Sequence, residues 1–422
     1  MVPWLTLSVA LAAAEPLELS ALEPKALAER VWREDASLQE ARAKVAQAEA
    51  ERRKALLLPN PGLDLGVNTL PVGPLNPPGL KDPLLNVPNV AVGLSVLLEL
   101  GKRGPRQALR QAESEAVALS ALEQLRQRVL DLRERIGDVA AAQLQVETLT
   151  GLAGDAERLA ALQAARADKG DASGLDADRA RLERVATGNA LASARGQLSA
   201  ALRSCAEVVA APCLPFRDAA QAGAWLDAPA EFDEALLPAR PDLRALEASS
   251  RAAEAAGRLA RGGRLPDPTV RAGYVRDQFV VSGNQQNSLF VGVSVPLPVF
   301  QRGHEDLEAA AVAARAASTE RTLRLDAARA KLRALGAEAA AVGERLAQLR
   351  SGAIPLAQDI VARLDEAVSR GAASLPELLV ARRTLSELLL SQVELQRTAY
   401  GLDVSRARQG GSPLELSPGD LP

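Results

Sequence analysis

The stretch Ser288–Gly303, SLFVGVSVPLPVFQRG, has a second copy earlier in the chain. When Val92–Gly104 (VGLSVLLELGKRG) is set beneath Val291–Gly303 (VGVSVPLPVFQRG), seven of thirteen positions are identical. In both copies large apolar residues alternate with small or polar ones, which is typical of a β-strand between two unlike environments. The large residues that share one face are Val90, Val92, Leu94 and Val96 in the first copy and Leu289, Val291, Val293 and Val295 in the second.

The composition argues against several classes of function. The chain has 422 residues, of which 24% are charged, but its formal net charge is only −3. Charge therefore does not indicate nucleic acid or anionic lipid as a partner. One histidine, one methionine and two cysteines leave almost no side chains for a metal site, so no metal or cofactor is expected. Aromatic residues make up 2%, and such a chain suits thin, closely spaced helices better than a thick globular core.

The first fourteen residues, MVPWLTLSVALAAA, are typical of a secretory signal peptide that ends in small residues before Glu15. A short apolar helix is the structural alternative. The run is too short to span a membrane, and no other apolar run is long enough. Any membrane crossing is therefore expected to consist of strands.

Helix-forming sequence surrounds two pairs of predicted strands. Residues 24–58 are predicted as one helix that ends at Pro59, and a long helical run follows Gly104 and continues to Cys205. A break at Lys169–Asp171 divides that run into helices of roughly 45 and 30 residues. The apolar residues of the first helix keep coiled-coil spacing, with Gln143 as the one polar exception. They are Leu122, Leu125, Val129, Leu132, Ile136, Val139 and Val146.

The second half of the chain repeats the first. Leu265–Pro268 (LPDP) repeats Leu58–Pro61 (LPNP), and the helical break at Arg370–Gly371 matches the one at Gly170 at a separation of 201 residues. We infer one internal duplication. The predicted parts are a signal peptide (1–14), a first repeat (15–206, strands near 61–98, helical hairpin 104–206), a link (207–232), a second repeat (233–408, strands near 268–298, helical hairpin 303–408) and a disordered tail (409–422).

Three duplicated motifs carry a resemblance to a known family. They are the two Leu-Pro-Asx-Pro strand entries, the two Val-Gly-x-Ser-Val strands that lead into Arg-Gly, and the two Gly-x5-acid-x3-Ala-Arg helix turns. In this order the motifs resemble the outer-membrane efflux protein family, the TolC-like ducts. The form Val295–Phe300 (VPLPVF) is similar to the branch that serves heavy-metal and drug pumps of the resistance-nodulation-division type.

The resemblance implies a mixed α/β membrane protein that forms a homotrimer. Each chain would give four strands to one twelve-stranded β-barrel and long helices to a coiled-coil tunnel in the periplasm. The residues support this, because four strands cannot enclose a lumen and an open sheet edge is not tolerated in lipid. The large apolar face would meet outer-membrane lipid and the small polar face would line water. Aromatic girdles are expected at the interfaces, and the aromatic residues available for them are Tyr274, Phe279, Phe290 and Phe300.

The implied function is that of an exit duct in the outer membrane of a Gram-negative bacterium. It would passively conduct substrates delivered by an inner-membrane pump of the resistance-nodulation-division type and a periplasmic adaptor (membrane fusion protein). The two matched turns would form a gate or an adaptor docking site at the periplasmic end. The residues concerned are Gly170, Asp176, Asp178 and Arg181 in the first turn, and Gly371, Glu377 and Arg382 in the second. The alternative is that these acids only stabilise helix N-termini.

Two cysteines bracket seven residues where the first repeat passes into the link. Cys205 and Cys213 could form a disulfide in an oxidising periplasm, or they could be two buried thiols. Relatives of this family often carry a lipid-modified cysteine after the signal, but Glu15 occupies that position, so no lipid anchor is expected.

Two other function classes compete with the duct. A periplasmic coiled-coil adaptor or scaffold without a pore would explain the helices but not the four two-faced strands. An enzyme has no supporting set of residues. Gly292-Val293-Ser294 suggests a hydrolase elbow, but Pro296 stands where the second glycine is needed, and His304 is the chain's one histidine. The sequence does not identify the exported substrate.

Overall fold

The structure is a computed structural model that describes residues 17–19, 24–72, 81–228, 234–278, 285–300 and 303–411. The predicted signal peptide lies outside these residues. The chain forms two compact units. Unit 1 consists of Met1–Arg42, Leu119–Arg244 and Leu323–Pro422, and unit 2 of Ala43–Ala118 and Ala245–Thr322.

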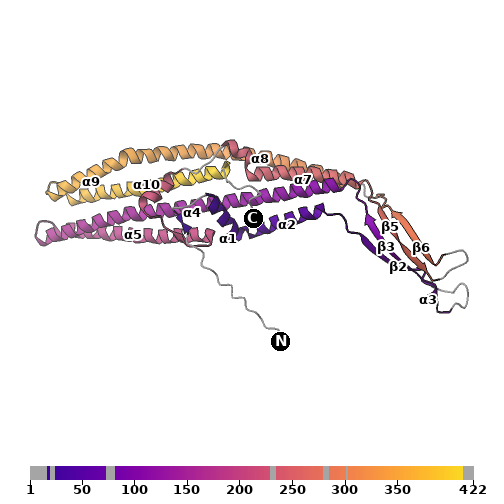
Figure 1. Cartoon of the computed structure of the whole chain (residues 1–422). Helices are drawn as coiled ribbons and strands as arrows, with labels where there is room; N and C mark the ends of the chain where they lie inside the picture. The colour runs from indigo at the N-terminus through magenta and orange to yellow at the C-terminus, as the bar shows by residue number, and fades with distance from the viewer. Residues whose placement is uncertain are drawn as a thin grey trace, which may run out of the picture. The chain divides into compact units, whose positions relative to one another are not determined.

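Unit 2 contains a four-stranded antiparallel sheet (Figure 1). Its strands are β2 (Gly62–Asn68), β3 (Asn89–Leu97), β5 (Thr269–Asp277) and β6 (Asn287–Ser294). Their order is β2-β3-β5-β6, so each repeat forms one hairpin and the two hairpins join through β3 and β5. The four strands predicted from the alternation are all present. A short helix, α3 (Pro83–Asn86), lies between β2 and β3.

A network of polar contacts joins the end of β3 to the start of β5. The Asp267 carboxylate accepts a hydrogen bond from the Leu100 backbone N–H at 2.9 Å and pairs with Lys102 Nζ at 2.7 Å. The Leu98 N–H donates to the Pro268 carbonyl at 2.9 Å. The carboxylate at the third position of the Leu-Pro-Asx-Pro motif thus serves both the Leu100 N–H and the Lys102 ammonium. The prolines on either side of it have no N–H that needs an acceptor.

The helical residues of unit 2 belong to four longer helices and are the parts next to the strands in sequence. These are α2 (Gln39–Leu56), α4 (Arg103–Asp168), α7 (Pro241–Gly263) and α8 (His304–Gln348), and each contributes residues to both units. Arg103 and Arg106 at the start of α4 donate to the carbonyls of Leu56 and Leu57, at the end of α2. The basic residues that follow the strand therefore cap the preceding helix, where four carbonyls lack intrahelical partners.

The predicted helix over 24–58 is interrupted. It consists of α1 (Pro24–Glu34), a 3₁₀ turn η2 (Ala36–Leu38) and α2. The interruption is at Asp35, whose side chain accepts from the Ser37 N–H and from Arg128 Nε, both at 2.7 Å. Burial raises the pKa of Asp35, but these hydrogen bonds outweigh it and leave that pKa below its usual value. The partner Arg128 comes from α4, so the break depends on a distant contact.

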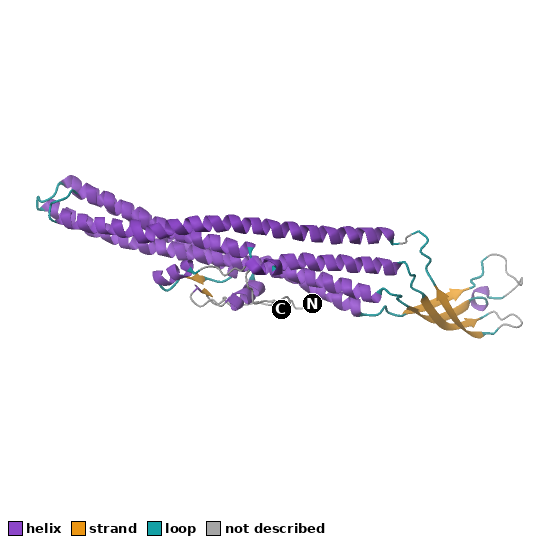
Figure 2. Ribbon diagram, turned by 90° about the horizontal axis from the view of Figure 1, so that it is seen from above, coloured by secondary structure: helices purple, strands orange, loops and turns teal. Residues whose placement is uncertain are grey.

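The first helical hairpin is longer than predicted. Helix α4 has 66 residues and α5 (Gly174–Val209) has 36, so the expected length of roughly 45 for the first helix was wrong. Helical structure begins at Arg103, well before the first seam residue, Leu122. A helix of this length extends on the order of 100 Å. Figure 2 shows the long helices of the chain in purple and the strands in orange.

The predicted seam of α4 forms the core of unit 1. Leu125, Leu132, Ile136 and Val139 are fully buried. The polar exception, Gln143, has its own partner: its amide donates to the Phe216 carbonyl at 2.8 Å and accepts from the Phe216 N–H at 2.9 Å. A half-buried polar side chain in the seam thus anchors the link between the repeats.

The second helical hairpin contains a wide turn that the sequence analysis missed. Helix α8 is followed by a π-helical turn, η4 (Leu349–Ala353), then by α9 (Ile354–Ser369) and α10 (Leu375–Gln409). Pro355 explains the turn, because proline lacks an N–H and its ring clashes with the carbonyl four residues earlier. The Ser351 hydroxyl donates to the Ala347 carbonyl at 2.8 Å beside it.

The link between the repeats is folded. It contains β4 (Cys213–Leu214), which pairs in parallel with β1 (Leu17–Glu18), and α6 (Ala219–Asp227). A 3₁₀ helix, η3 (Glu234–Ala239), follows. The Trp225 indole of α6 donates to the Tyr400 hydroxyl of α10 at 3.1 Å, so the link is packed against the helices of unit 1.

Regular structure continues past residue 409, where the disordered tail was predicted to begin. Gln409 is still helical, and Gly410 and Gly411 are buried. The remainder of the predicted tail, 412–422, lies outside the described residues.

Two arginines hold the C-terminal end of α10. Arg126, only 1% exposed, donates to the carbonyls of Ala407 at 3.0 Å and Arg408 at 2.9 Å, and forms two bonds to the Glu123 carboxylate. Arg240 donates to the Gln409 carbonyl at 2.6 Å. Guanidinium groups therefore satisfy the helix-end carbonyls that would otherwise be unpaired in the interior.

Replacing Arg126 with methionine keeps the apolar stem but removes the charge and the donors. We expect unit 1 to lose about 3–5 kcal/mol of stability, because the carbonyls lose their donor and Glu123 loses its charged partner and keeps only the Gln127 amide. Replacing both Arg126 and Glu123 with apolar residues should recover part of that loss. Arg158→Met is the control, since Arg158 forms a salt bridge in which its side chain is 77% exposed. Thermal unfolding measures all three; equal effects of Arg126→Met and Arg158→Met would contradict the interpretation.

Candidate functional site

One face of the sheet is apolar and exposed. Residues directly opposite in the four strands share a face, and the register places Leu65, Val92, Tyr274 and Leu289 in one row of that face. The exposed apolar residues of this face are Leu63, Leu65, Val67, Val90, Val92, Leu94, Val96, Tyr274, Leu289, Val291 and Val293. Val295, also exposed, follows the end of β6. All eight residues predicted to face lipid are exposed, and the seven that lie in strands share this face.

The opposite face carries small and polar residues. Asp64 and Arg271 are exposed on it, and glycines occupy much of the rest. Phe290, one of the aromatic residues available for a girdle, lies on this polar face instead. A Cβ added to Gly273 would lie 2.6 Å from its ring, and one added to Gly93 would lie 3.0 Å away. The Phe290 ring therefore fills the space that the two glycines leave open.

The apolar face has a polar boundary at each end. At one end the register places Arg276 opposite Asn287, and Asn287 accepts a hydrogen bond from the Tyr274 hydroxyl. At the other end lies the ion pair between Lys102 and Asp267. An apolar band between two polar boundaries is the pattern of a surface that crosses a nonpolar layer.

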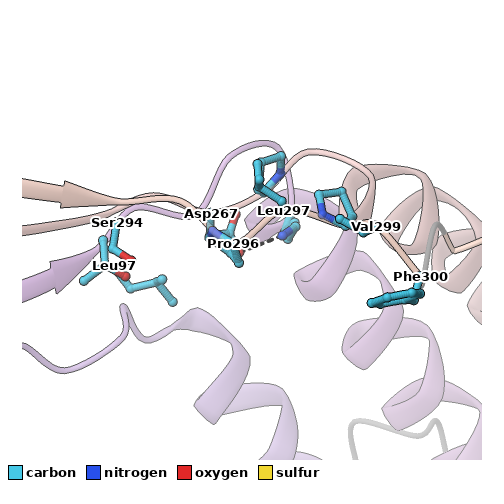
Figure 3. Close-up of a pocket in the computed structure, with 12 residues that line it drawn as sticks. Leu97, Asp267, Ser294, Pro296, Leu297, Val299 and Phe300 are labelled. Atoms are coloured by element: carbon cyan, nitrogen blue, oxygen red, sulfur yellow. Dashed lines mark hydrogen bonds and ion pairs between the residues drawn. The ribbon is translucent and has the colours of Figure 1, made fainter.

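A pocket of about 780 Å³ lies where the strands give way to helices. Figure 3 shows Leu97 and Ser294 at the strand end, Asp267 beside them, and Pro296, Leu297, Val299 and Phe300 along the following segment. Leu297 is 77% and Phe300 97% exposed. The lining offers mostly apolar side chains and one ion pair, so the pocket is suited to packing against another chain.

The two matched turns in unit 1 have the same backbone structure. Gly170 has φ 81° and Gly371 has φ 75°, which glycine adopts at little cost. The Gly170 N–H donates to the Ala167 carbonyl and the Asp171 N–H to the Arg166 carbonyl, at 3.0 and 2.8 Å. The second turn repeats both bonds, from Gly371 to Val368 and from Ala372 to Ala367. Both helices therefore end in a Schellman motif.

Both turns begin a capped helix, but only the acid of the second turn takes part through its carboxylate, since the Asp176 carboxylate pairs with Arg179 at 3.3 Å. The Asp176 N–H donates to the Ser173 hydroxyl at 3.1 Å, and Ser374 and Glu377 form a capping box in which the Ser374 N–H donates to the Glu377 carboxylate at 3.4 Å. Asp178 lies 3.9 Å from Arg181, and both side chains are more than 70% exposed. The capping alternative thus has structural support, and the carboxylates remain accessible.

Arg382 is placed differently from its equivalent, Arg181. It donates to the Asp365 carboxylate of α9 at 2.8 Å and to the Asp155 carbonyl of α4 at 3.3 Å, rather than to Glu377. Arg166 of α4 donates to the Val368 carbonyl at 3.2 Å. The Asp155 partner was not predicted from the sequence, because Asp155 belongs to the first repeat and lies 227 residues away. A shared apolar cluster supports the contact: Leu159, Ala180, Val368, Leu375 and Leu378.

The two cysteines are joined. Cys205 and Cys213 form a disulfide with their Cα atoms 6.1 Å apart. Cys213 is in β4, opposite Leu17, so the bond connects the end of α5 to the short sheet of the link. Closing a loop in this way lowers the conformational entropy of the unfolded chain and so stabilises the folded one.

The described residues offer no group of three or more His, Cys, Asp or Glu side chains that could hold a metal ion. His304 begins α8, and its Nδ1 lies 3.3 Å from Arg264 Nη2. Across the part of the chain that the structure describes, no helix is both long and apolar enough to cross a membrane.

Several solved structures share this architecture. The chain matches CusC, which forms a transmembrane channel, with a TM-score of 0.72 and 17% identity over 92% of each chain. It matches the outer membrane protein VceC of Vibrio cholerae with a TM-score of 0.70 and 18% identity, over 92% of this chain and 96% of VceC. The chain has the fold of these channels. The match to the open state of the outer membrane channel MtrE of Neisseria gonorrhoeae has a TM-score of 0.68 and 15% identity, over 92% and 89% of the chains.

No protein-family model matches the sequence, and no curated protein matches it. The single-chain fold that the sequence resemblance implies is therefore confirmed through structure alone, at identities below 20%.

Replacing Gly170 with alanine tests the turn geometry. Alanine in the left-handed region costs about 1–2 kcal/mol, which corresponds to roughly 5- to 30-fold faster local opening. Hydrogen exchange of the amides of Gly170 and Asp171 measures it. Gly174→Ala is the matched control: both glycines have open space around them, but Gly174 begins a helix without a positive φ. Similar acceleration in both variants would exclude the left-handed backbone as the cause.

Proposed function

We propose that three copies of this chain form the outer-membrane exit duct of a tripartite efflux system. The observation that carries the proposal is the sheet, which exposes a continuous apolar face and has a neighbouring strand on only one side of β2 and of β6 among the described residues. Both features are unfavourable for a single chain in water.

The open edges argue for several chains in one barrel. A strand edge in hydrocarbon leaves N–H and C=O groups unsatisfied at a cost of several kcal/mol each. Four strands cannot enclose a channel, whereas three copies supply twelve strands. The small residues of the polar face would then line the lumen, and the apolar face would contact lipid.

The height of the apolar face fits an outer membrane. Strand β5 and its entry span ten residues, or nine residue-to-residue steps, from Asp267 to Arg276. At 3.4 Å per residue this is about 30 Å along the strand. A strand tilt of about 40° reduces it to about 23 Å, close to the band of about 25 Å of outer-membrane barrels.

The helices would form the periplasmic part of the duct. The resemblance and the fold both support a coiled-coil tunnel, with a periplasmic adaptor and an inner-membrane transporter of the resistance-nodulation-division type as partners. The duct would be passive and would not act as an enzyme, so the transporter would supply the energy. The Cys205–Cys213 disulfide is consistent with an oxidising periplasm.

The matched turns are the proposed gate or adaptor docking site. Asp178 and Arg181 are exposed and available to a partner, as is the charge of Glu377. Arg382 with Asp365 would act differently, by holding α9 and α10 together near the turn. The remaining proposed members are Gly170, Asp176 and Gly371.

Arginine at adjacent positions of β6 tests which face meets lipid. Val293→Arg should destabilise the membrane-inserted barrel by about 2–4 kcal/mol, because it puts a charge in the apolar band. Ser294→Arg should destabilise it much less, because that residue is on the polar face. The measurement is the yield of heat-sensitive trimer in the outer-membrane fraction. If the two variants insert equally well, the facing assignment fails. If the wild-type protein is extracted without detergent, the soluble scaffold is favoured instead.

Two substitutions at Glu377 separate charge from capping. Glutamine keeps the capping box but removes the charge, whereas alanine removes both. If the carboxylate is a gate latch, both variants should raise single-channel conductance while adaptor cross-linking is retained. If it is a docking point, both should abolish efflux with conductance unchanged. A change in the alanine variant alone would assign Glu377 to helix capping only.

A further inference from the structure

We propose that strand β6 of one copy pairs with strand β2 of a second copy in one specific antiparallel register, in which Val293 lies opposite Leu65 and Ser294 opposite Asp64. This inference rests on the proposed multi-chain barrel and adds the residue-level interface. It identifies a second copy of this chain as the partner of both free edges.

The internal duplication extends to the strand register of the two hairpins. Residues of β6 lie 199 positions after their equivalents in β3, as Val92 and Val291 show. Residues of β5 lie 207 positions after their equivalents in β2, as Leu58–Pro61 and Leu265–Pro268 show. The first hairpin pairs Leu65 with Val92, and the second pairs Ala272 with Val291. These are equivalent pairs, so sequence repeat and backbone register agree independently.

The pairing of β3 with β5, which joins the two hairpins, also predicts how the free edges pair. Within the chain, β3 pairs with β5 so that Val92 lies opposite Tyr274 and Ser95 opposite Arg271. The equivalent of β3 is the free edge β6, and the equivalent of β5 is the free edge β2. The same joint between two copies therefore places Val291 opposite Val67 and Ser294 opposite Asp64.

The chemistry of the transferred pairs is consistent. Val291 meets Val67, Val293 meets Leu65 and Val295 meets Leu63, so large apolar residues continue on the apolar face. On the other face Gly292 meets Gly66 and Ser294 meets Asp64, so small and polar residues continue as well. A register shifted by one residue would put every apolar side chain of the second copy on the polar face.

Residues of β6 are more exposed than their equivalents in β3, because β6 has a neighbouring strand on one side only among the described residues. Val92 in β3 is 45% exposed, whereas its equivalent Val291 in β6 is 78% exposed. Beyond the strands the same holds: Leu98 is 45% and Leu297 77% exposed. Leu98 runs beside Pro268 in the chain, so Leu297 would run beside Pro61 of the second copy. The pocket in Figure 3 would thus be covered by that copy's Leu-Pro-Asx-Pro segment.

Barrel geometry favours this register over its neighbours. Across the sheet, Leu65 of β2 lies opposite Val92 of β3, which lies opposite Tyr274 of β5. The repeat equivalent of Leu65 in β5 is Ala272, so the register advances by two residues over two strands. An advance of two residues per two strands gives a tilt of about 35°. Slipping the interface by two residues would give about 47° or about 20°. Outer-membrane barrels have tilts of about 35–45°.

Cysteine pairs in the full-length chain test the register. We expect oxidation of Asp64→Cys/Ser294→Cys or of Leu65→Cys/Val293→Cys in outer membranes to give covalent dimers and trimers on non-reducing gels. Adjacent pairs alternate between close and wide spacing, so one of the two is favourable. Within one chain these positions are three strand spacings apart, about 14 Å, too far for a disulfide. Each single variant controls for random collision.

Gly66→Cys/Ser294→Cys is the matched control, with both residues on the polar face and the register slipped by two. Preferential cross-linking of this pair would overturn the proposed register, and so would trimers in which neither expected pair cross-links. Chemical cross-linking of the wild-type protein reports separately on assembly. If it gives no trimer, the proposed function itself fails, and the register with it.

Discussion

The unpaired backbone of a strand at the edge of a sheet is the constraint on which this molecule depends. Each edge presents a row of N–H and C=O groups, and hydrocarbon provides no partner for them. Among the described residues, the chain combines two such edges, β2 and β6, with an exposed face that is apolar between its polar ends. Water disfavours the face and lipid disfavours the edges. The proposed barrel, with lipid on one side and further strands at both edges, would satisfy both.

The duplicated parts are built from local hydrogen bonds, and the unique parts from distant ones. Both helical turns use a positive-φ glycine and the same two Schellman bonds. Their arginines differ: the side chain of Arg181 is 71% exposed, but that of Arg382 is 21% exposed against Asp365. The residue equivalent to Asp365 is Ala164, so Arg181 has no acid at that position and lies 3.9 Å from Asp178 instead. Divergence has thus changed side-chain partners while the backbone pattern has been kept.

Much of the fold was predictable because it depends on short-range pattern. Alternation located all four strands, the seam located the core of α4, and glycine located both turns. The break at Asp35 was missed because Arg128 lies 93 residues away. The Asp155 partner of Arg382 was missed for the same reason, since Asp155 comes from the other repeat. No periodicity encodes such contacts, and the folded link, with only two residues in β4, is too short to show one.

The equal register of the two hairpins has a consequence for how such a chain can arise. A polypeptide of one repeat would present the same two kinds of edge as a polypeptide of two. Fusion of two genes for such a unit turns every second contact between subunits into a contact within one chain. Fewer separate molecules would then be needed to complete a barrel of the proposed kind. The two halves also become free to accumulate different substitutions, which identical subunits from a single gene cannot do.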